Sequence, residues 1–246
     1  MPILNEIDAE NGCVLIINKP LHWTSFDVVN KLRYHLQKNL HLYKTIQPGQ
    51  KPKIKVGHAG TLDPLATGVL LVCIGKETKN IDQYMATEKT YTGSIFLGAT
   101  TASYDLETEP ENFQSIQHLT HDLIENTAKQ FEGALMQFPP MHSAIKKDGK
   151  RLYEHARAGE VVEINPRPIQ IMSFKIVEIK LPEVLFEVTC SKGTYIRSLA
   201  HDFGKALQCG GYLAGLCRTQ NGIYPVSQAL SIDEALSLIQ TTTASV

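Results

Sequence analysis

Asp63 is the carboxylate of a glycine-rich stretch, residues 57–68, that reads GHAGTLDPLATG. The glycines allow backbone conformations that other residues avoid, and Pro64 keeps Asp63 out of the helical region. The apolar run over residues 69–74 is short, continuous and partly β-branched, which predicts a buried strand. These features predict an acid on a stiff, extended loop at the mouth of a buried strand. Such a carboxylate can act as a nucleophile or as a base.

The same stretch also has a purely structural interpretation, because Asp-Pro with nearby glycines is common turn chemistry. Residues 57–60 match the GXXG clamp of KH domains, but four residues do not specify that domain. Gly75-Lys76 does not complete a phosphate-binding P-loop, since the upstream glycine is too distant and Glu77 occupies the Ser/Thr position. The residues alone therefore make Asp63 a candidate without assigning it a reaction.

Length and composition are those of an ordinary globular protein. The 246 residues suffice for a sizeable core, in one large domain or in two small ones. Hydrophobic residues make up 43% and charged residues 20% of the chain. No apolar stretch approaches the ~20 residues that span a bilayer, and the N-terminus lacks the pattern of a signal peptide. We therefore expect a cytoplasmic protein without membrane contact.

Cysteine and histidine spacing does not indicate a metal site. The five cysteines form no CxxC pair and the nine histidines no HExxH motif. Cys73 and Cys190 lie in apolar or strand-like surroundings, which favours buried free thiols over disulfides or zinc ligands. We expect neither a metal nor a cofactor.

Positive charge is unevenly distributed, although the net charge is only −1. Residues 28–62 contain no acidic residue and lead directly into the Asp63 loop, whereas acidic residues gather between positions 105 and 132. A charge run is commonly just a solvated surface, but next to a candidate catalytic carboxylate it favours phosphate binding. The two basic groups are Lys31, Arg33, Lys38, Lys44, Lys51, Lys53 and Lys55, and then Lys146, Lys147, Lys150, Arg151 and Arg157.

Hydrophobic periodicity predicts strands and helices around these candidates, and therefore an α/β (α+β) fold with a mixed, largely antiparallel sheet. Trp23 is expected to pack against the first helix. Residues 39–55 are expected to form a loop or hairpin. Strands are predicted over residues 13–17, 89–98 and 184–190. Helices are predicted over 28–36 (N-cap Thr24 or Ser25), 119–131 (N-cap Thr120), 196–203 (N-cap Thr194) and 232–239, and one begins near Leu152.

Several other residues have both a structural and a functional interpretation. Tyr91 lies near the start of a predicted strand, where packing is the ordinary role of a tyrosine. Tyr195 and Arg197 fall off the apolar stripe of the helix over 196–203, so Arg197 could be a surface arginine. His58 could be a neutral core histidine or an RNA contact.

Five blocks of sequence, in order, resemble the TruB-type tRNA pseudouridine synthases, which isomerise a uridine of the tRNA T-loop at position 55. The resemblance covers residues 12–230. In one place the chain departs from the family pattern, because the segment over 101–105 lacks an acidic residue often found there. The blocks lie at 17–20 (INKP), 55–76, 89–98 (beginning KTY and ending LG), 137–146 (QFPPMHSAIK, with Gly149, Tyr153, Ala156 and Arg157 in step) and 190–197 (CSKGTYIR).

The resemblance implies roles for individual residues. It implies that Asp63 is the catalytic nucleophile or base, that Arg197 pairs with it, and that Tyr91 stacks on the target base. It further implies three substrate-binding residues, with His58 against the T-loop, Tyr195 lining the pocket, and Leu216 or its neighbours closing it. Lys19 belongs to the family's KP motif beside the catalytic loop, and we include it with the substrate-binding residues in an auxiliary role.

The resemblance also implies an architecture and a partner. The fold is expected to be a pseudouridine synthase fold, with one catalytic domain over residues 1–246 and a tRNA-gripping insertion at about 100–165. A complete C-terminal RNA-binding domain of the PUA type is not expected. The partner is the T-arm of tRNA, and the protein is expected to act as a monomer without an obligatory protein partner.

Three rival functions stay open from the residues. An RNA chaperone or tRNA-folding module would need the basic surface but not Asp63. An RNA-guided or rRNA-directed relative, of the archaeal and eukaryotic branch, is disfavoured by the bacterial-looking motifs. A retaining glycoside hydrolase would need a second carboxylate near Asp63, and the motif blocks supply an arginine instead.

Overall fold

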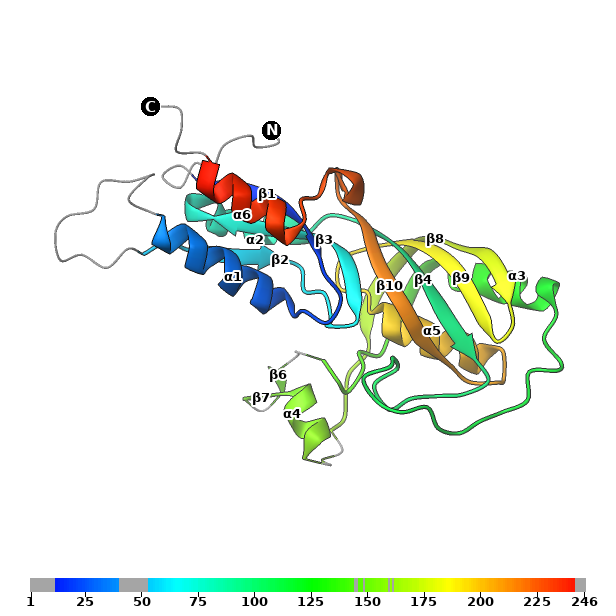
Figure 1. Cartoon of the computed structure of the whole chain (residues 1–246). Coiled ribbons are helices and arrows are strands. Elements are labelled where there is room, and N and C mark those ends of the chain that lie inside the picture. Colours follow the sequence, from blue (N-terminus) through cyan, green and yellow to red (C-terminus); the bar gives the residue numbers. More distant parts are fainter. Residues whose placement is uncertain are drawn as a thin grey trace. The chain divides into compact units, whose positions relative to one another are not determined.

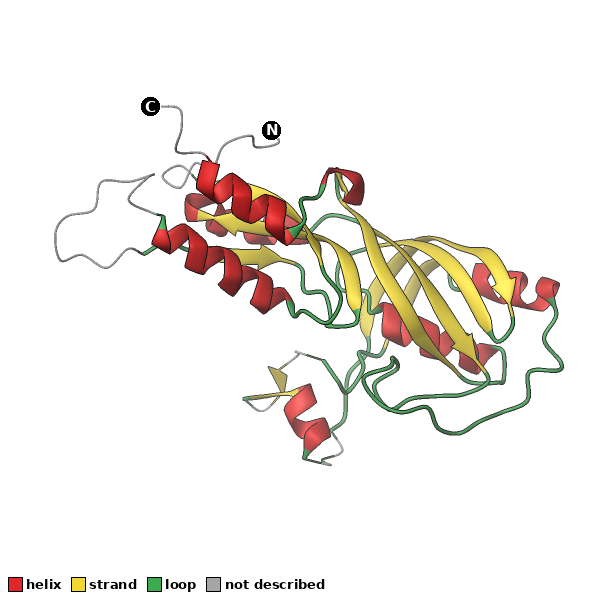
Figure 2. Cartoon of the chain, in the orientation of Figure 1, coloured by secondary structure: helices red, strands yellow, loops and turns green. Residues whose placement is uncertain are grey.

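The computed structural model describes residues 12–39, 53–143, 146–147, 149–158, 160 and 162–241. The chain forms two compact units, one of residues 1–89 and 217–246 and one of residues 90–216. Figure 1 follows the chain by residue number and Figure 2 shows its helices and strands. The chain passes from the second unit back into the first within strand β10 (Gly211–Asn221).

The first unit is an antiparallel sheet with helices packed against it. Strand β3 pairs with β1 along one edge and with β2 along the other, both antiparallel. Its strands are β1 (Cys13–Lys19), β2 (Val56–Ala59), β3 (Ala66–Ile74), the end of β10, and β11 (Tyr224–Pro225). Its helices are α1 (Ser25–Lys38), the 3-10 helix η2 (Gly75–Asn80), α2 (Ile81–Met85), the 3-10 helix η3 (Val226–Gln228) and α6 (Ile232–Thr241).

Strand β3 is buried on both faces, which explains its unbroken apolar sequence. Leu70 and Val72 point into one core cluster, together with residues of β1, α1 and α6. Val69, Leu71 and Cys73 point into a second cluster, against which Ile81 of α2 packs. The sequence prediction of a buried strand after the Asp63 loop is confirmed.

Helix α1 begins where its capping residues predict. Thr24 accepts a hydrogen bond from the Asp27 amide and Asp27 bonds back to the Thr24 amide, which completes a capping box. Four apolar residues spaced for one helical face are buried, namely Val28, Val29, Leu32 and Leu36. Trp23 packs against the same cluster, as predicted, and α6 lies beside α1 (Figure 1).

The second unit continues the antiparallel pattern, with the strand order β10-β4-β9-β8-β5. Strand β8 pairs antiparallel with β9 and with β5. The strands are β4 (Lys89–Leu97), β5 (Gly133–Gln137), β6 (Lys146–Lys147), β7 (Lys150–Arg151), β8 (Arg167–Lys180), β9 (Glu183–Cys190) and the start of β10. The helices are α3 (His121–Lys129), α4 (Leu152–Arg157) and α5 (Ile196–Ala206).

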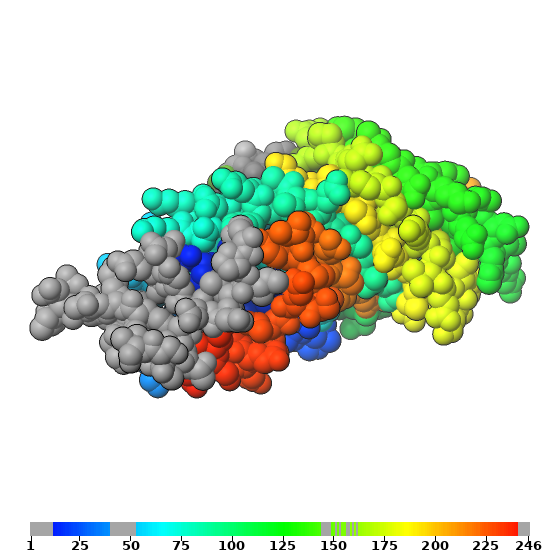
Figure 3. Space-filling view, turned by 90° about the horizontal axis from the view of Figure 1, so that it is seen from above, coloured from blue at the N-terminus to red at the C-terminus, as the bar shows by residue number. Residues whose placement is uncertain are grey.

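Four phenylalanines form an aromatic core in this unit. Phe174 of β8 meets Phe203 of α5 edge-on, with ring centroids 5.4 Å apart, and Phe186 of β9 at 5.8 Å. Phe131 contacts both Phe174 and Phe203, also edge-on. Such pairs stabilise by about 0.5–1.5 kcal/mol each beyond their buried area. The cluster fixes α5 on the sheet, while α3 and the β8–β9 hairpin lie side by side at the surface (Figure 3).

Most predicted elements are confirmed, and two local predictions are wrong. Thr194 does not cap α5, because Tyr195 occupies the N-cap position and the Thr194 hydroxyl bonds to the Ser191 carbonyl. The apolar spacing over 119–131 predicts that Leu123 shares a buried face with Ile124 and Ala128, but Leu123 is 40% exposed, and Ile124, Thr127 and Ala128 are the buried residues of α3. Residues 57–59 of the GXXG stretch belong to strand β2.

Some sequence predictions fall outside what the structure describes. Most of the predicted loop over 39–55, with Lys44 and Lys51, lies outside the described residues, as do the side chains of Lys146, Lys147, Arg151 and Arg157. Residues 100–165 lie in the second unit. Their interpretation as an insertion in a single domain stays a prediction.

We predict that Gly68→Ala destabilises the fold by about 3 kcal/mol or more. Gly68 has a φ of +98°, and an added Cβ would lie 2.2 Å from the Arg218 carbonyl oxygen. Gly133→Ala is the matched control, because its φ is +105° but nothing lies within 4 Å of the added Cβ. Urea unfolding should show a cost of only about 1 kcal/mol for the control. Equal costs for the two variants would contradict the close approach of β10 to Gly68.

Candidate active site

The Asp63 loop is held by a buried ammonium group. Lys19, at the end of β1, is fully buried, and its Nζ donates to the carbonyl oxygens of Trp23, Pro20 and Pro64, the last at 3.4 Å. Burial lowers the pKa of Lys19 from 10.5 to about 8, and the neighbouring negative charge of Asp63 opposes part of that change. The cation therefore ties the backbone after Asp63 to the core and places a positive charge near the Asp63 carboxylate.

Two further contacts fix the backbone on either side of Asp63. The Ser25 hydroxyl accepts from the Leu62 amide at 2.8 Å and donates to the Leu62 carbonyl at 3.0 Å. The His22 amide donates to the Pro64 carbonyl at 2.8 Å. Asp63 itself is half-buried, and its carbonyl accepts from the Ala66 amide in the turn that leads into β3. The loop is therefore positioned by the start of α1 as well as by β1.

A second buried cation, Arg218 of β10, holds the strands on both sides of the loop. Its Nε donates to the Val69 carbonyl at 2.7 Å and one Nη to the Gly60 carbonyl at 3.0 Å. Sequence reasoning did not identify this residue as part of the site. Its sequence signal is a charged side chain directly after the apolar first part of β10, residues 211–217, and its acceptors lie 149 and 158 residues away.

His58 lies on β2, opposite Val72 of β3. Its ring is largely buried, and Nδ1 has no hydrogen-bond partner among the described residues. Burial, and then the positive charge of Arg218, lowers the pKa of His58 below its usual 6.5. The imidazole is therefore neutral at neutral pH, which suits contact with a base or a ribose better than pairing with a phosphate.

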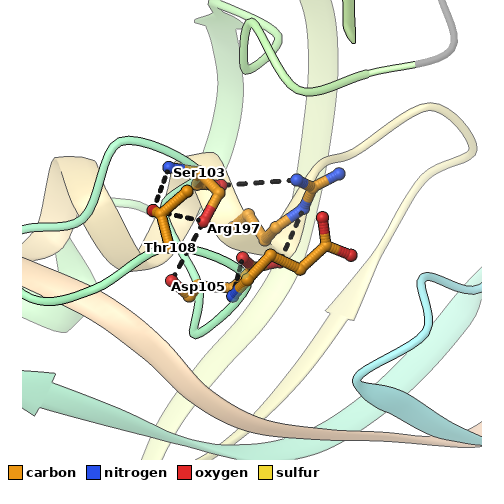
Figure 4. A network of polar contacts seen from close by, with 5 residues as sticks. Ser103, Asp105, Thr108 and Arg197 are labelled. Atoms are coloured by element: carbon orange, nitrogen blue, oxygen red, sulfur yellow. Dashed lines mark hydrogen bonds and ion pairs between the residues drawn. The ribbon is translucent and has the colours of Figure 1, made fainter. Parts of the chain in front are cut away.

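In the second unit, Arg197 is buried and paired with a carboxylate that sequence reasoning had not proposed. Arg197 Nε lies 3.5 Å from Asp105 Oδ2, and both side chains are almost fully buried. One Nη donates to the Ser103 carbonyl at 3.3 Å. Figure 4 shows Asp105 and Ser103 converging on the guanidinium from one loop. The interpretation of Arg197 as a surface arginine is therefore wrong.

Tyr195 and the start of α5 are positioned by β5. The Gln137 side chain accepts from the Tyr195 amide at 2.8 Å and donates to the Tyr195 carbonyl at 3.0 Å. The Ser198 hydroxyl donates to the Phe138 carbonyl at 2.8 Å. Two of the blocks noted in the sequence, which begin at Gln137 and at Cys190, therefore meet in space. Tyr195 itself is half-buried.

Tyr91 and Leu216 lie on neighbouring strands of this unit, β4 and β10. The Tyr91 side chain is 8% exposed, and Leu216 is half-buried. These two strands approach each other closely at Gly93, where an added Cβ would lie only 2.3 Å from the Gly215 carbonyl oxygen. A glycine at this point permits the contact.

The predicted site residues fall into two groups. Lys19, His58 and Asp63 belong to the first unit, and Tyr91, Tyr195, Arg197 and Leu216 belong to the second. Within the first unit, Lys19 lies next to the Asp63 loop, and within the second unit Tyr91 and Leu216 lie on neighbouring strands. The predicted pairing of Arg197 with Asp63 joins the two units and stays a prediction.

Neither a metal cluster nor a membrane helix is found in the part of the chain that the structure describes. No three His, Cys, Asp or Glu side chains among those residues are placed to hold a metal ion. None of the described helices is both long and apolar enough to cross a bilayer.

Comparison with known proteins gives consistent results. Residues 47–196 match the TruB family pseudouridylate synthase (N-terminal domain). The tRNA pseudouridine synthase B of Flavobacterium johnsoniae is 55% identical over 221 residues, which cover 90% of this chain and 93% of that protein. The protein of the same name from Bacteroides fragilis is 48% identical over 224 residues, covering 91% and 92%.

Solved structures show a similar fold. A Cbf5-Nop10-Gar1 complex contains a chain that matches 94% of this one with a TM-score of 0.67 and 26% identity. The archaeal box H/ACA sRNP Nop10-Cbf5 complex matches 95% with a TM-score of 0.64 and 24% identity. In both cases the match covers 55% of the other chain's length.

We predict that Lys19→Met lowers the free energy of unfolding by about 2–3 kcal/mol, because buried carbonyl acceptors lose their donor. Lys55→Met is the matched control, since the Lys55 side chain is exposed just before β2. Urea unfolding of both variants measures the difference. A Lys19→Met protein as stable as the control would show that the ammonium does not hold the loop.

Proposed function

Since this chain belongs to the TruB family of pseudouridylate synthases and is an isomerase that acts on uridine in tRNA, we propose that its target lies in the T-loop and that Asp63 carries the reaction. The observation that supports this most is the Asp63 loop itself. Its backbone is held by Lys19, Ser25 and His22, and its carboxylate lies beside a buried cation. A fixed, ionised carboxylate is what the chemistry requires.

The isomerisation exchanges one glycosidic bond for another. The bond between N1 and C1′ breaks, and a bond between C5 and C1′ forms. A proton leaves C5 and another reaches N1, so that the product has the same composition as the substrate. Asp63 either attacks the ribose or removes a proton from it, and both routes begin with an ionised carboxylate.

Residues of the second unit are proposed to complete the site. Arg197 would pair with Asp63 and keep it ionised, with its guanidinium oriented by Asp105 and the Ser103 carbonyl. Tyr91 would stack on the uracil, which must first leave the RNA stack because its reacting atoms are otherwise inaccessible. Tyr195 and Leu216 would line the pocket. On this proposal the two units work as one catalytic domain.

The first unit also offers a surface suited to phosphates. Lys31 and Lys38 are exposed on α1, whose first turn is bonded to the Asp63 loop through Ser25. Burial, and then the positive charges of Lys31 and Lys38, lowers the pKa of His35 between them. We propose that this face binds the tRNA backbone, that the T-arm suffices as a substrate, and that the protein acts as a monomer in the cytoplasm, where tRNA is modified.

We predict that Asp63→Asn abolishes pseudouridine formation in an unmodified tRNA transcript and leaves tRNA affinity within about threefold, because the amide cannot act as nucleophile or base. Asp82→Asn, an exposed substitution on α2, is the control and should keep full activity. Pseudouridine is mapped at single-nucleotide resolution.

The outcomes of this experiment separate the functions. Product outside the T-loop would overturn the proposed target, and product from Asp63→Asn would overturn the proposed role of Asp63. If both the wild type and the control bind tRNA without forming product, the protein is an RNA-binding or RNA-folding module instead.

We also predict that Lys31→Gln combined with Lys38→Gln weakens tRNA binding while kcat stays unchanged. Each lost phosphate contact should reduce the slope of log K against log salt by about 1, because fewer counterions are released on binding. Lys129→Gln is the control, since Lys129 is exposed on α3 within the acid-rich segment. Binding is measured by filter retention at several salt concentrations. An unchanged slope would mean that α1 does not bind phosphates.

A further inference from the structure

The loop over residues 101–108 docks on helix α5 at two adjacent points. Arg197 and His201 lie four residues apart on α5, so their side chains share one face, one turn apart. Asp105 pairs with Arg197, and the preceding residue, Tyr104, stacks on His201. The two rings are nearly parallel, with centroids 3.9 Å apart and an angle of 15° between their planes. Two consecutive loop residues, Tyr104 and Asp105, therefore contact two side chains that lie one turn apart on the same face of α5.

The backbone of Tyr104 adopts a conformation that its side chain does not favour. Its φ is +65°, in the left-handed region that is costly for an aromatic residue. The Tyr104 amide donates to the Thr101 carbonyl at 3.2 Å, and the Tyr104 carbonyl accepts from the Leu213 amide of β10 at 2.9 Å. Residues that keep such a conformation do so because the surrounding contacts over-determine it. The stack on His201 is one of these contacts.

The His201 ring is placed for stacking rather than for polar contact. Its Nδ1 is buried and has no hydrogen-bond partner among the described residues. Burial, and to a smaller extent the charge of Lys205, lowers the pKa of His201, so the ring is neutral near pH 7. The phenol and the imidazole therefore form a pair of neutral rings between the loop and the helix.

Other polar contacts of the loop lie within the loop itself. The Ser103 amide and hydroxyl bond to the Thr108 hydroxyl, and Asp105 Oδ1 accepts from the Glu107 amide at 3.0 Å. These bonds shape the loop internally (Figure 4). Contact with α5 includes the Arg197 side chain, which meets Asp105 and the Ser103 carbonyl, and the Tyr104–His201 stack.

We propose that Tyr104 is a positioning residue, whose stack on His201 holds Asp105 against the Arg197 guanidinium and so sets the orientation of that guanidinium for the reaction. The effect on turnover rests on the proposed function, in which Arg197 acts on Asp63. Tyr104 touches no reacting atom in this account. Its loss should therefore lower kcat and leave tRNA affinity nearly unchanged.

Two variants of Tyr104 and one control distinguish the effect of its aromatic ring from the effect of its backbone conformation. Tyr104→Phe keeps the aromatic ring and therefore the stack on His201. It removes only the phenol hydroxyl, which forms no hydrogen bond among the described contacts. Tyr104→Asn removes the ring but keeps a residue type that tolerates a positive φ. Phe113→Ala is the control, since it removes an exposed aromatic ring from the segment that follows the loop. We expect Tyr104→Asn to lower kcat by about 10-fold to 100-fold, with Kd for tRNA within about twofold, while Tyr104→Phe and the control match the wild type.

A second readout follows the loop without any assay of activity. The Glu107 amide reports on the Asp105 carboxylate, and the Leu213 amide reports on the Tyr104 carbonyl. Hydrogen exchange at both amides, followed by NMR in the whole protein, should accelerate in Tyr104→Asn and stay slow in Tyr104→Phe. His201→Ala should reproduce the Tyr104→Asn effects, and the double variant should be no worse than either single one.

The two readouts distinguish the possible failures. A Tyr104→Asn protein with wild-type kcat, or with wild-type exchange at Glu107 and Leu213, would overturn the positioning role. Additive losses in the double variant would also overturn it, because the two residues would then act separately. A wild type that forms no pseudouridine would overturn the proposed function, and exchange at the two amides would still decide whether the stack positions Asp105.

Discussion

A buried cation must find acceptors inside the protein, and this requirement shapes the loop that carries Asp63. The ammonium of Lys19 has left water completely, so its cost is offset only if protein oxygens replace the hydration shell. The oxygens are backbone carbonyls, and one of them, that of Pro64, belongs to the residue directly after Asp63. The position of the carboxylate is therefore coupled to the stability of the core. Arg218 repeats the principle with the carbonyls of Gly60 and Val69.

The second unit uses the same physical device with different partners. Arg197 is buried at the first turn of α5, and it meets a carboxylate and a carbonyl from one loop. Burying an arginine beside an acid favours a single orientation of the planar guanidinium, which a flexible surface arginine would not have. The aromatic core around Phe174 and Phe203 fixes the helix that carries it. Both units thus place an ionised side chain by burying it, and both depend on backbone carbonyls to make burial tolerable.

Buried cations that hold the loops around them are compatible with uridine isomerisation, which exchanges one bond for another without a net change of oxidation state. On the proposed mechanism, isomerisation of uridine uses a carboxylate of fixed position, a surface for the extruded base and a way to hold the polyanionic RNA. Neutral His58 suits contact with a base or a ribose, whereas the exposed lysines of α1 suit contact with phosphates. The division follows from burial, because the His58 ring is largely buried, which lowers its pKa, whereas the two lysines are exposed to solvent.

Elements whose signals are local could be predicted from the amino-acid sequence alone. The apolar run after Gly68 predicted β3, the candidate caps Thr24 and Ser25 with the apolar spacing that follows predicted α1, and the alternation over residues 184–190 predicted β9. Periodicity and capping depend on neighbours in the chain, and such neighbours can be read directly from it. The glycines and the proline beside Asp63 likewise made it a candidate without assigning it a reaction, and comparison confirmed the family resemblance.

The residues that hold the site became visible in the folded chain. Arg218 finds its acceptors 149 and 158 positions away, and Arg197 meets Ser103 across 94 positions. No local pattern encodes such contacts, because they arise when segments distant in the chain pack together. Thr194 was misassigned as a cap for the same reason, since Gln137 of β5 already satisfies the Tyr195 backbone from outside the helix. A charged residue beside an apolar run can be recognised in a sequence, but its hydrogen-bond partners depend on how the chain folds.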